Sequence, residues 1–244
     1  MKKTIFFFNL IMLTTMLTGC FNERNSIVPS KTQITKKYSV SPFNKIESNV
    51  VANIVFVQDS TTAVEAKGPE NYIPHIVVSS KDSTLRIKMD NEKTKFSSLR
   101  GNKVEIRVYA PELISLAHKG VGDVILQGTI KVADLTVNSN GVGNVKSDAL
   151  EGNHIEVYST GVGNVVLRGK ANSAYYESKG VGNLNAKEMI VSDATVEQKG
   201  VGNVSCYASG KINITSKGVG NVEYYGNPEV TGLNKAGVGS VKSK

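Results

Sequence analysis

Apolar residues in the second half of the chain stand at fixed distances from a repeated Gly-Val-Gly tripeptide. Successive tripeptides are 18 to 21 residues apart and begin at Gly120, Gly141, Gly161, Gly180, Gly200, Gly218 and Gly237. Valine or leucine stands four residues after each first glycine, and an apolar residue or tyrosine stands four residues before it. A near-constant period of this size indicates a solenoid, in which each repeat stacks on its neighbours.

The spacing of the apolar rows within each repeat predicts strands. The rows lie four and six residues before and after the first glycine, so they differ by two, which is the period of a β-strand. No run within 113–244 has the i, i+3, i+4 pattern of a helix. The pattern therefore predicts an all-β fold: a parallel β-helix with coils of about 20 residues, right-handed like most parallel β crossovers.

The residues of the tripeptide itself predict a tight corner. Glycine tolerates the backbone conformations of a sharp turn. The middle valine never varies, and we expect this row to point inward and seal the corner. The row two residues later, mostly asparagine, predicts side chains that hydrogen-bond from coil to coil. A calcium site needs several carboxylates, but this row holds only Asp123, so no metal is expected.

Residues 38–112 also have strand-like alternation, without a fixed period. Leu85, Ile87 and Met89 form one apolar face, and Val104, Ile106 and Val108 form another. No linker separates this part from the repeat. We therefore expect a single domain over 38–244, in which an irregular β portion (38–112) caps the end of the repeat solenoid (113–244).

Several of these features together resemble a known family. The pattern comprises Phe43-x-x-Ile46, Leu85-x-Ile87, Val104-x-Ile106-x-Val108-x-x-Pro111-x-Leu113 and serial Gly-x-Gly-x-Val corners. It is similar to the putative auto-transporter adhesin, head GIN domain family, a domain of unknown function, over about 38–244. The family usually has Gly-Ser-Gly at the corner, whereas this chain has Gly-Val-Gly. The resemblance implies a β-helical protein of the cell envelope and brings no functional residues with it.

The N-terminus has the features of a bacterial lipoprotein. A basic start, an apolar stretch from Ile5 to Leu17 and the sequence Leu17-Thr18-Gly19-Cys20 predict a signal peptide over 1–19 and lipidation (palmitate) of Cys20. Residues 20–37 are polar and are expected to form a flexible tether. These features predict an outer-membrane lipoprotein, either periplasmic or surface-exposed. Its lipid is expected to attach it to the membrane, which is thus its partner.

Charge and cysteine content add limited constraints. Loss of Lys2 and Lys3 with the signal peptide lowers the net charge from +8 to +6, which fits an acidic partner surface. With Cys20 lipidated, Cys206 has no cysteine to pair with, and its row predicts a buried core thiol. Basic and aromatic residues do not interleave, so no nucleic acid is expected as a partner.

The candidate chemistry lies just before the corners. Lys179, Lys199 and Lys217 each precede the first glycine of a corner, in three consecutive coils, and predict a cationic column. This column is either a stripe that binds an anionic ligand or a row that serves solubility and protects the edge. Glu177 and Glu197 stand two residues before two of these lysines, which predicts a salt-bridged, solvent-facing row rather than a catalytic pair. The three histidines have no metal-type spacing, so neither a metal nor another cofactor nor a catalytic residue is expected.

These observations favour a non-enzymatic, lipid-anchored β-solenoid that binds or adheres at the cell envelope, with an anionic glycan or another envelope component as its ligand. Two alternatives remain open: an enzyme that acts on polysaccharides through Glu177 and Glu197, and a structural envelope protein that associates with itself. The sequence leaves the oligomeric state undetermined.

Overall fold

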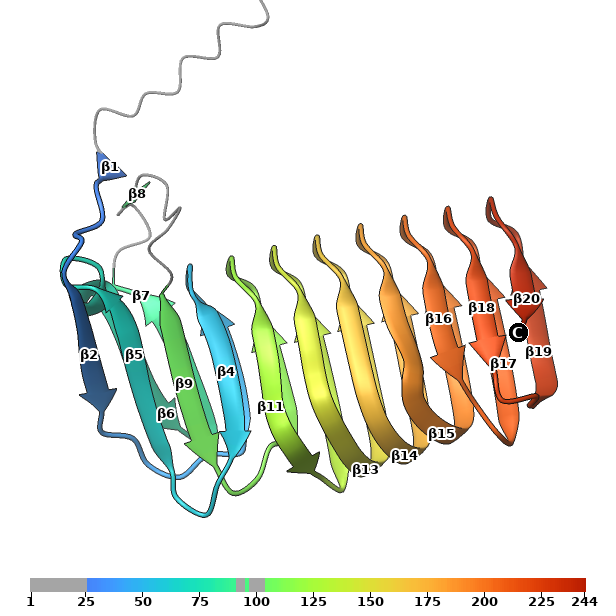
Figure 1. Cartoon of the computed structure of the whole chain (residues 1–244), viewed down its shortest axis with the longest axis horizontal. Coiled ribbons are helices and arrows are strands. Elements are labelled where there is room, and N and C mark those ends of the chain that lie inside the picture. Colours follow the sequence, from blue (N-terminus) through green and yellow to red (C-terminus); the bar gives the residue numbers. More distant parts are fainter. Residues whose placement is uncertain (1–25, 91–94, 97–103) are drawn as a thin grey trace, which may run out of the picture.

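The computed structural model describes residues 26–90, 95–96 and 104–244. The signal peptide predicted over 1–19 and the lipidated Cys20 lie outside the described residues. The described chain forms one elongated solenoid, with the irregular part at one end and the C-terminus at the other (Figure 1). No helix in the described part is long and apolar enough to cross a membrane.

Two walls of strands run along the solenoid and meet at the Gly-Val-Gly corners. The first wall leads into the corners; its separate strands are β6 (Ile76–Lys81), β7 (Thr84–Met89), β3 (Lys45–Asn49), β10 (Ser115–His118), β12 (Asp134–Ser139), β17 (Lys211–Ser216) and β19 (Glu229–Lys235). The second wall leads away from them; its separate strands are β2 (Gln33–Tyr38), β5 (Ala63–Pro69), β9 (Glu105–Ala110), β4 (Asn53–Gln58), β11 (Val124–Lys131), β16 (Val204–Tyr207), β18 (Val222–Tyr225) and β20 (Val241–Ser243).

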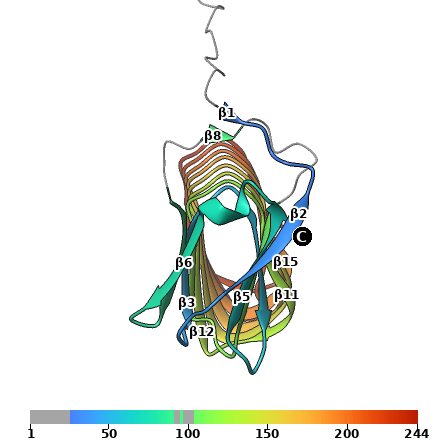
Figure 2. The same cartoon turned by 90° about the vertical axis from the view of Figure 1, so that its left-hand side faces the viewer.

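Three long strands belong to both walls, because each runs down the second wall, around the far turn and up the first. They are β13 (Val145–Ser159), β14 (Val165–Ser178) and β15 (Leu184–Gln198). The view along the axis shows the narrow arch of stacked corners above the two walls (Figure 2).

Parallel pairing in register stacks like residues from coil to coil. Leu116 pairs with Val137, and Val137 pairs with Val157. All three side chains are buried in one core that runs from Phe43 to Val222. Because full burial of such a side chain contributes about 1.5–3 kcal/mol, the repeated rows provide the main stabilisation. The predicted all-β solenoid with coils of about 20 residues is confirmed.

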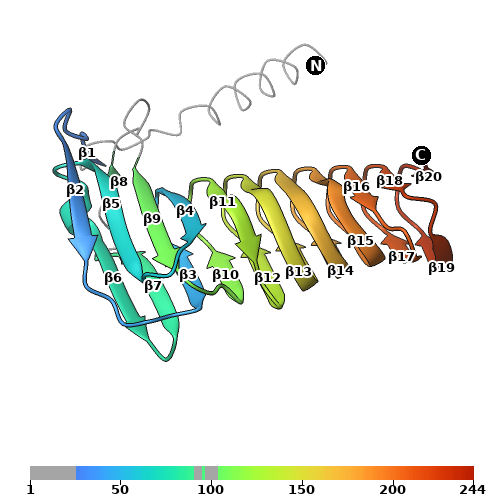
Figure 3. The same cartoon turned by 60° about the horizontal axis from the view of Figure 1, so that its bottom comes forward.

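The N-terminal part is less regular, as expected. Strand β5 pairs antiparallel with β2 on one side and with β9 on the other. On the opposite wall, β6 and β7 form an antiparallel hairpin whose second strand continues the parallel sheet through β3. The 3-10 helix η3 (Ile73–His75) joins β5 to β6 across the end of the core (Figure 3). A short parallel pair, β1 (Ser26–Ile27) with β8 (Lys95–Phe96), lies beyond it.

The tether predicted over 20–37 is wrong for its last five residues. They lie in strand β2, where Thr35 pairs with Lys67 and Tyr38 with Val64. Tyr38 also packs against the core, and burial raises the pKa of its hydroxyl to about 12. The polar composition concealed this strand because most side chains of β2 are exposed and only its backbone is needed to cover the edge of β5.

Candidate functional site

A straight row of exposed valines runs along the corners of the solenoid. We call it the corner ridge; between 40 and 70% of each side chain is exposed, and its members are Val51, Val121, Val142, Val162, Val181, Val201, Val219 and Val238. Each valine forms a single parallel bridge with the valine of the next coil. Exposed apolar residues scattered singly are ordinary in soluble proteins, whereas eight in one line form a continuous surface.

The prediction that these valines point inward is wrong, and the strand period explains why. His118 and Gly120 are buried, Lys119 and Val121 are exposed, and Val124 is buried again. The alternation of the first wall therefore continues through the corner, which places the first glycine inside and the valine outside. The uniformity of the row reflects stacking along the surface of the corner and not burial.

The glycines are required by close approach and by backbone conformation. A Cβ atom on Gly161 would lie 2.0 Å from the backbone oxygen of Gly141 in the preceding coil. The second glycine of the same corner, Gly163, has a φ of 148°, which L-residues rarely adopt. Both glycine rows therefore lack side chains, and the corner ridge stands between two bare strips of backbone.

The asparagine row forms the ladder that the sequence predicts. The side-chain oxygen of Asn144 accepts a hydrogen bond of 3.0 Å from the backbone N–H of Asn164, whose own oxygen accepts one of 2.9 Å from Asn183. The same bond recurs in the later coils and ends at Ser240. The side of the corner ridge that faces the second wall is thus fixed by hydrogen bonds and uncharged from Asn144 to Ser240, with Asp123 as the one carboxylate at its start.

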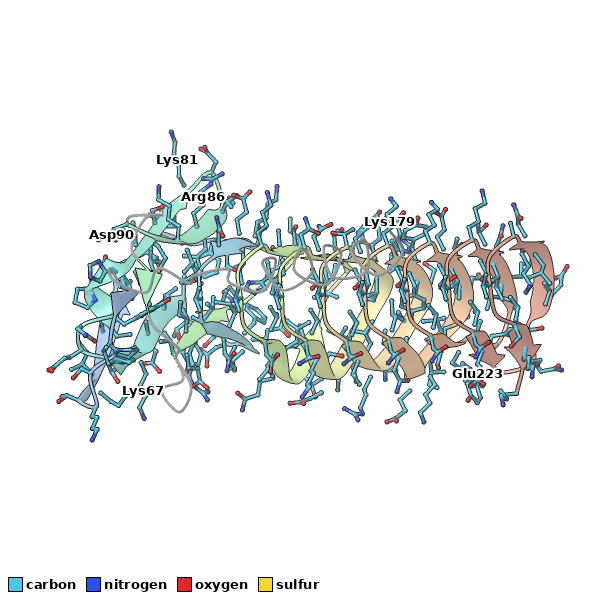
Figure 4. The ribbon with its side chains drawn as sticks, turned by 90° about the horizontal axis from the view of Figure 1, so that it is seen from above. Lys67, Lys81, Arg86, Asp90, Lys179 and Glu223 are labelled. Atoms are coloured by element: carbon cyan, nitrogen blue, oxygen red, sulfur yellow. The ribbon has the colours of Figure 1, made fainter. Side chains whose placement is uncertain are left out.

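The lysine column, defined as Lys179, Lys199 and Lys217, lies on the other side of the ridge. Figure 4, with the corners toward the viewer, shows Lys179 on the flank opposite Glu223. A shallow groove of about 460 Å³ runs between the column and the last four ridge valines, with the first glycines as its floor. The three lysines therefore lie in one row beside the ridge.

Two of the three lysines are already paired with carboxylates. Lys179 lies 2.8 Å from Glu177, and Lys199 contacts Glu197 and lies 3.8 Å from Glu177. The hydrogen bond from Lys199 holds the pKa of Glu197 below its ordinary value and raises that of Lys199. Lys217 has no ion pair among the described residues. The stripe is thus neutralised over two coils and cationic over the third.

The carboxylate pair is less exposed than its sequence suggests. Glu177 and Glu197 are register partners, but only 8% of the Glu177 side chain is exposed, beneath Lys179 and Lys199. A general acid needs a carboxyl whose pKa is raised, whereas that of Glu197 is lowered. This arrangement matches the predicted salt-bridged row, apart from the burial of Glu177.

A second groove of about 690 Å³ lies where the β6–β7 hairpin meets the first corner. Strands β7, β3 and β10 line it, together with the ridge valines Val51 and Val121. Its cations are Lys88, Lys119 and Arg86, and only Arg86 has an ion pair within the described chain, with Glu47 at 3.1 Å. Sequence reasoning missed this groove because it depends on where the hairpin leaves the solenoid.

A buried polar row lies inside the corner, two residues before the first glycine of each corner from Gly120 to Gly218 and before Val50 in the first coil. Its members are Ser48, His118, Ser139, Ser159, Ser178, Gln198 and Ser216. Gln198 donates to the carbonyls of Gly200 and Gly202 and accepts from the N–H of Gly218. Burial lowers the pKa of His118, whose Nδ1 lies 2.7 Å from the Ser48 hydroxyl. The strand period could have identified this inward row.

The cysteine and the histidine on the first wall lie in surroundings that explain them by packing and hydrogen bonding. Cys206 is a buried free thiol, as predicted, and burial raises its pKa to about 12, so it is a poor nucleophile. His154 contacts Ser173 and Glu156 on the first wall. Within the described ranges, no group of three or more histidine, cysteine, aspartate or glutamate side chains could hold a metal ion.

Known proteins match the chain by sequence family and by fold. The family model described as "Putative auto-transporter adhesin, head GIN domain" matches residues 42–228. A crystal structure of a putative adhesin from Bacteroides fragilis is 37% identical, with a TM-score of 0.86, over 90% of this chain and 100% of its own. No curated protein matches the chain.

Two crystal structures from Parabacteroides distasonis share the fold at lower identity. One, described as a putative adhesin, is 22% identical with a TM-score of 0.67 and covers 90% of this chain and 100% of its own. The other, described as a putative lipid binding protein, is 19% identical with a TM-score of 0.63 and covers 89% of this chain and 99% of its own.

Proposed function

The chain belongs to the putative auto-transporter adhesin, head GIN domain family, and from this premise we propose that it is a lipid-anchored, non-enzymatic binding protein of the cell envelope. The observation that carries the proposal is the corner surface: an exposed valine ridge flanked by cations on a rigid stack of coils. Such a surface offers one long contact and no enclosed cavity, which suits adhesion to an extended envelope component.

The anchor is proposed at Cys20. A lipobox cysteine carries acyl chains, and two or more chains hold a protein stably on a membrane. Metabolic labelling of the full chain with a palmitate analogue should mark the wild type and not Cys20→Ala. Protease treatment of intact cells should then distinguish a surface-exposed protein, which is degraded, from a periplasmic one, which is protected. A wild-type chain that is not labelled would exclude the lipid anchor.

The ligand is proposed to be anionic, an envelope glycan being the first candidate. Lys217 in the lysine column and Lys88 and Lys119 at the second groove are its free cations, since none has a carboxylate partner among the residues that the structure describes. Lys179 and Lys199 contribute once a ligand competes with Glu177 and Glu197. Surface charges of this kind act through long-range attraction that salt screens.

Binding to immobilised anionic glycans tests this surface. Replacing Lys179, Lys199 and Lys217 by Gln should weaken salt-sensitive binding at least tenfold. A matched control replaces Lys131, Lys187 and Lys211, which are exposed and lie away from the corners. Equal losses in the two triple variants would indicate a net-charge effect and exclude a specific stripe.

The non-enzymatic assignment rests on the state of the carboxylates. Glu177 pairs with Lys179 and Lys199, Glu197 pairs with Lys199, and the pKa of Glu197 is lowered, whereas a general acid needs a raised one. We expect the wild type to release no reducing ends from envelope polysaccharides. Release that is lost in Glu177→Gln would favour the enzyme instead.

A further inference from the structure

The corner ridge is the most unusual surface of the molecule, because its apolar residues point outward in an unbroken line. We propose that this ridge and the cations beside it form a membrane-contact surface, which lays the solenoid lengthwise along an anionic lipid bilayer. This proposal deepens the proposed function, because it names a phospholipid surface as the partner of the corner. The orientation of the solenoid on the bilayer rests on the lipid anchor of that proposed function.

The shape of the ridge suits a planar partner. Eight valines at the coil spacing of ~4.8 Å form a line about 34 Å long. The glycines on both sides place no side chain between the valine methyl groups and an approaching surface. Apolar side chains along one face, with cations beside them, are the composition of segments that lie in the membrane interface.

The charges beside the ridge suit phosphate headgroups. Lys88 and Lys119 lie at the first corners and Lys217 lies near the last, and no carboxylate pairs with them in the described part of the chain. Lysine can bury its stem along apolar surface while its ammonium reaches the headgroups. Anionic lipid surfaces attract such residues strongly within a Debye length.

The start of the described chain lies on the same side as the ridge. Strand β1 stands above the arch of corners, whereas the far turns of the solenoid point away from it (Figures 1 and 2). Cys20 and Ser26 are six residue steps apart in the sequence, and six steps span at most about 20 Å. A lipid on Cys20 therefore holds the corner side, and not the opposite side, near the bilayer.

A second copy of the chain fits the same ridge less well. Ridges facing each other would place Lys88, Lys119 and Lys217 of both molecules, cations that have no ion pair in the described chain, at one interface, and like charges across an interface oppose association. An anionic bilayer offers the opposite charge along the whole length. The charge pattern thus favours lipid over self-association.

Vesicle binding by a chain that begins at Phe21 tests the ridge without the anchor. The described core lies between Phe43 and Val222, and a crystal structure 37% identical covers the equivalent of 90% of the chain, so this form retains the folded unit. We expect it to co-sediment with vesicles of phosphatidylglycerol and phosphatidylethanolamine in equal parts. Binding should fall with added salt and be absent with phosphatidylcholine alone.

Two sets of variants separate the apolar and the charged contributions. Val181→Ser with Val201→Ser should weaken binding about tenfold, while Ile190→Ser with Val230→Ser, which are similarly exposed but off the ridge, should not. Replacing Lys88, Lys119 and Lys217 by Gln should weaken binding about a hundredfold. Circular dichroism and melting temperature show that each variant is folded.

Each contrary outcome has a distinct meaning. The proposal would be overturned if the wild type did not bind vesicles. It would also be overturned if the Val181/Val201 variant and the Ile190/Val230 variant lost binding equally. Dimerisation through the ridge, or binding only to soluble anionic glycans, would contradict it as well. Failure of Cys20 to be labelled in cells would exclude the anchor, while binding of the anchor-free chain to vesicles would still support the ridge.

Discussion

The corner of the solenoid and its two walls place polar and apolar residues in opposite ways. In the walls, Val137 and Val157 are fully buried while polar side chains face solvent. At the corner, Val142 and Val162 are exposed, and the polar Ser139 and Ser159 lie inside. The same two-residue period produces both arrangements, so the difference lies in which residue type occupies each position.

The reason for the difference is backbone hydrogen bonding. In the walls, the strands of the inner coils pair with the coils on both sides, so few polar side chains are needed inside; the buried Ser147, which bonds to the backbone of Arg168 where the register shifts, is an exception. At the corner the ladder shrinks to single bridges, and buried turn groups require other partners. Gln198 provides such a partner for the Gly202 carbonyl and adds second hydrogen bonds to Gly200 and Gly218. A polar row inside the corner therefore stabilises the turn while leaving the outer row free for valine.

The largest effect is expected where the corner admits no side chain. Gly161→Ala should lower the free energy of unfolding by about 4 kcal/mol or more, because the new Cβ would lie 2.0 Å from Gly141 oxygen and force the coils apart. Gly128→Ala is the control: its φ is 78° but nothing lies within 4 Å of the new Cβ, so about 1 kcal/mol is expected. Urea denaturation measures both, and equal losses would contradict the close-approach argument.

The inner polar row should show the next largest effect. Gln198→Leu conserves much of the volume but removes the side-chain hydrogen bond to the Gly202 carbonyl, for which the described residues provide no other donor, together with second hydrogen bonds to Gly200 and Gly218; this should cost about 3 kcal/mol. The exposed Gln127 on the second wall is the control, and its replacement by Leu should change stability by less than about 0.5 kcal/mol. If Gln198→Leu were as stable as the wild type, the polar row would not be needed at the corner.

Two valines three residues apart test the comparison most directly. Val165→Ala removes a buried wall side chain and should cost about 2 kcal/mol. Val162→Ala removes an exposed corner side chain, 52% accessible, and should change stability by less than about 0.5 kcal/mol. Melting temperatures and urea midpoints provide the measurement. A large loss for Val162→Ala would mean that the ridge stabilises the fold and is not free to serve a partner.

The walls could be predicted from the sequence because their contacts are local to the repeat. Each coil lies against the next one along the chain, so aligning residues on Gly120, Gly141 and Gly161 also aligns neighbours in space. That alignment placed Lys179 and Lys199 beside their glutamates and Cys206 in the core. Applied through the corner, the same alternation would also have placed Val121 outside and His118 inside. The uniform valine row masks this alternation, because invariant apolar rows usually lie in a core.

The N-terminal cap could not be predicted in the same way. Strand β5 pairs with β2 and with β9, on stretches more than 25 residues away in opposite directions along the chain. No period relates these segments, and the side chains of β2 are mostly exposed and polar. The second groove depends on the departure of the β6–β7 hairpin from the first wall. Pairings of this kind are decided by tertiary contacts and not by local pattern.

The smallest effect concerns the one histidine in the inner row, where six other members are serine or glutamine. Burial lowers the pKa of His118 below the ordinary value of 6.5, although Asp123 nearby acts in the opposite direction. The unfolded chain therefore binds a proton more readily than the folded chain. Stability present at pH 7 and above should decrease as the pH falls below 6.5, by at most about 1.4 kcal/mol per pH unit.

Replacing His118 by Ser, the residue at this position in the neighbouring coils, isolates the contribution of His118 to the pH dependence of stability. The variant loses the contact with Ser48, so it should be somewhat less stable than the wild type at pH 7.5. As the pH is lowered toward 5.5 only the wild type meets the cost of keeping His118 neutral, so the two unfolding free energies should converge. Urea titrations at a series of pH values measure the difference. A gap that stays constant with pH would show that His118 is protonated as readily inside the corner as in the unfolded chain, and that the inner row is open to water.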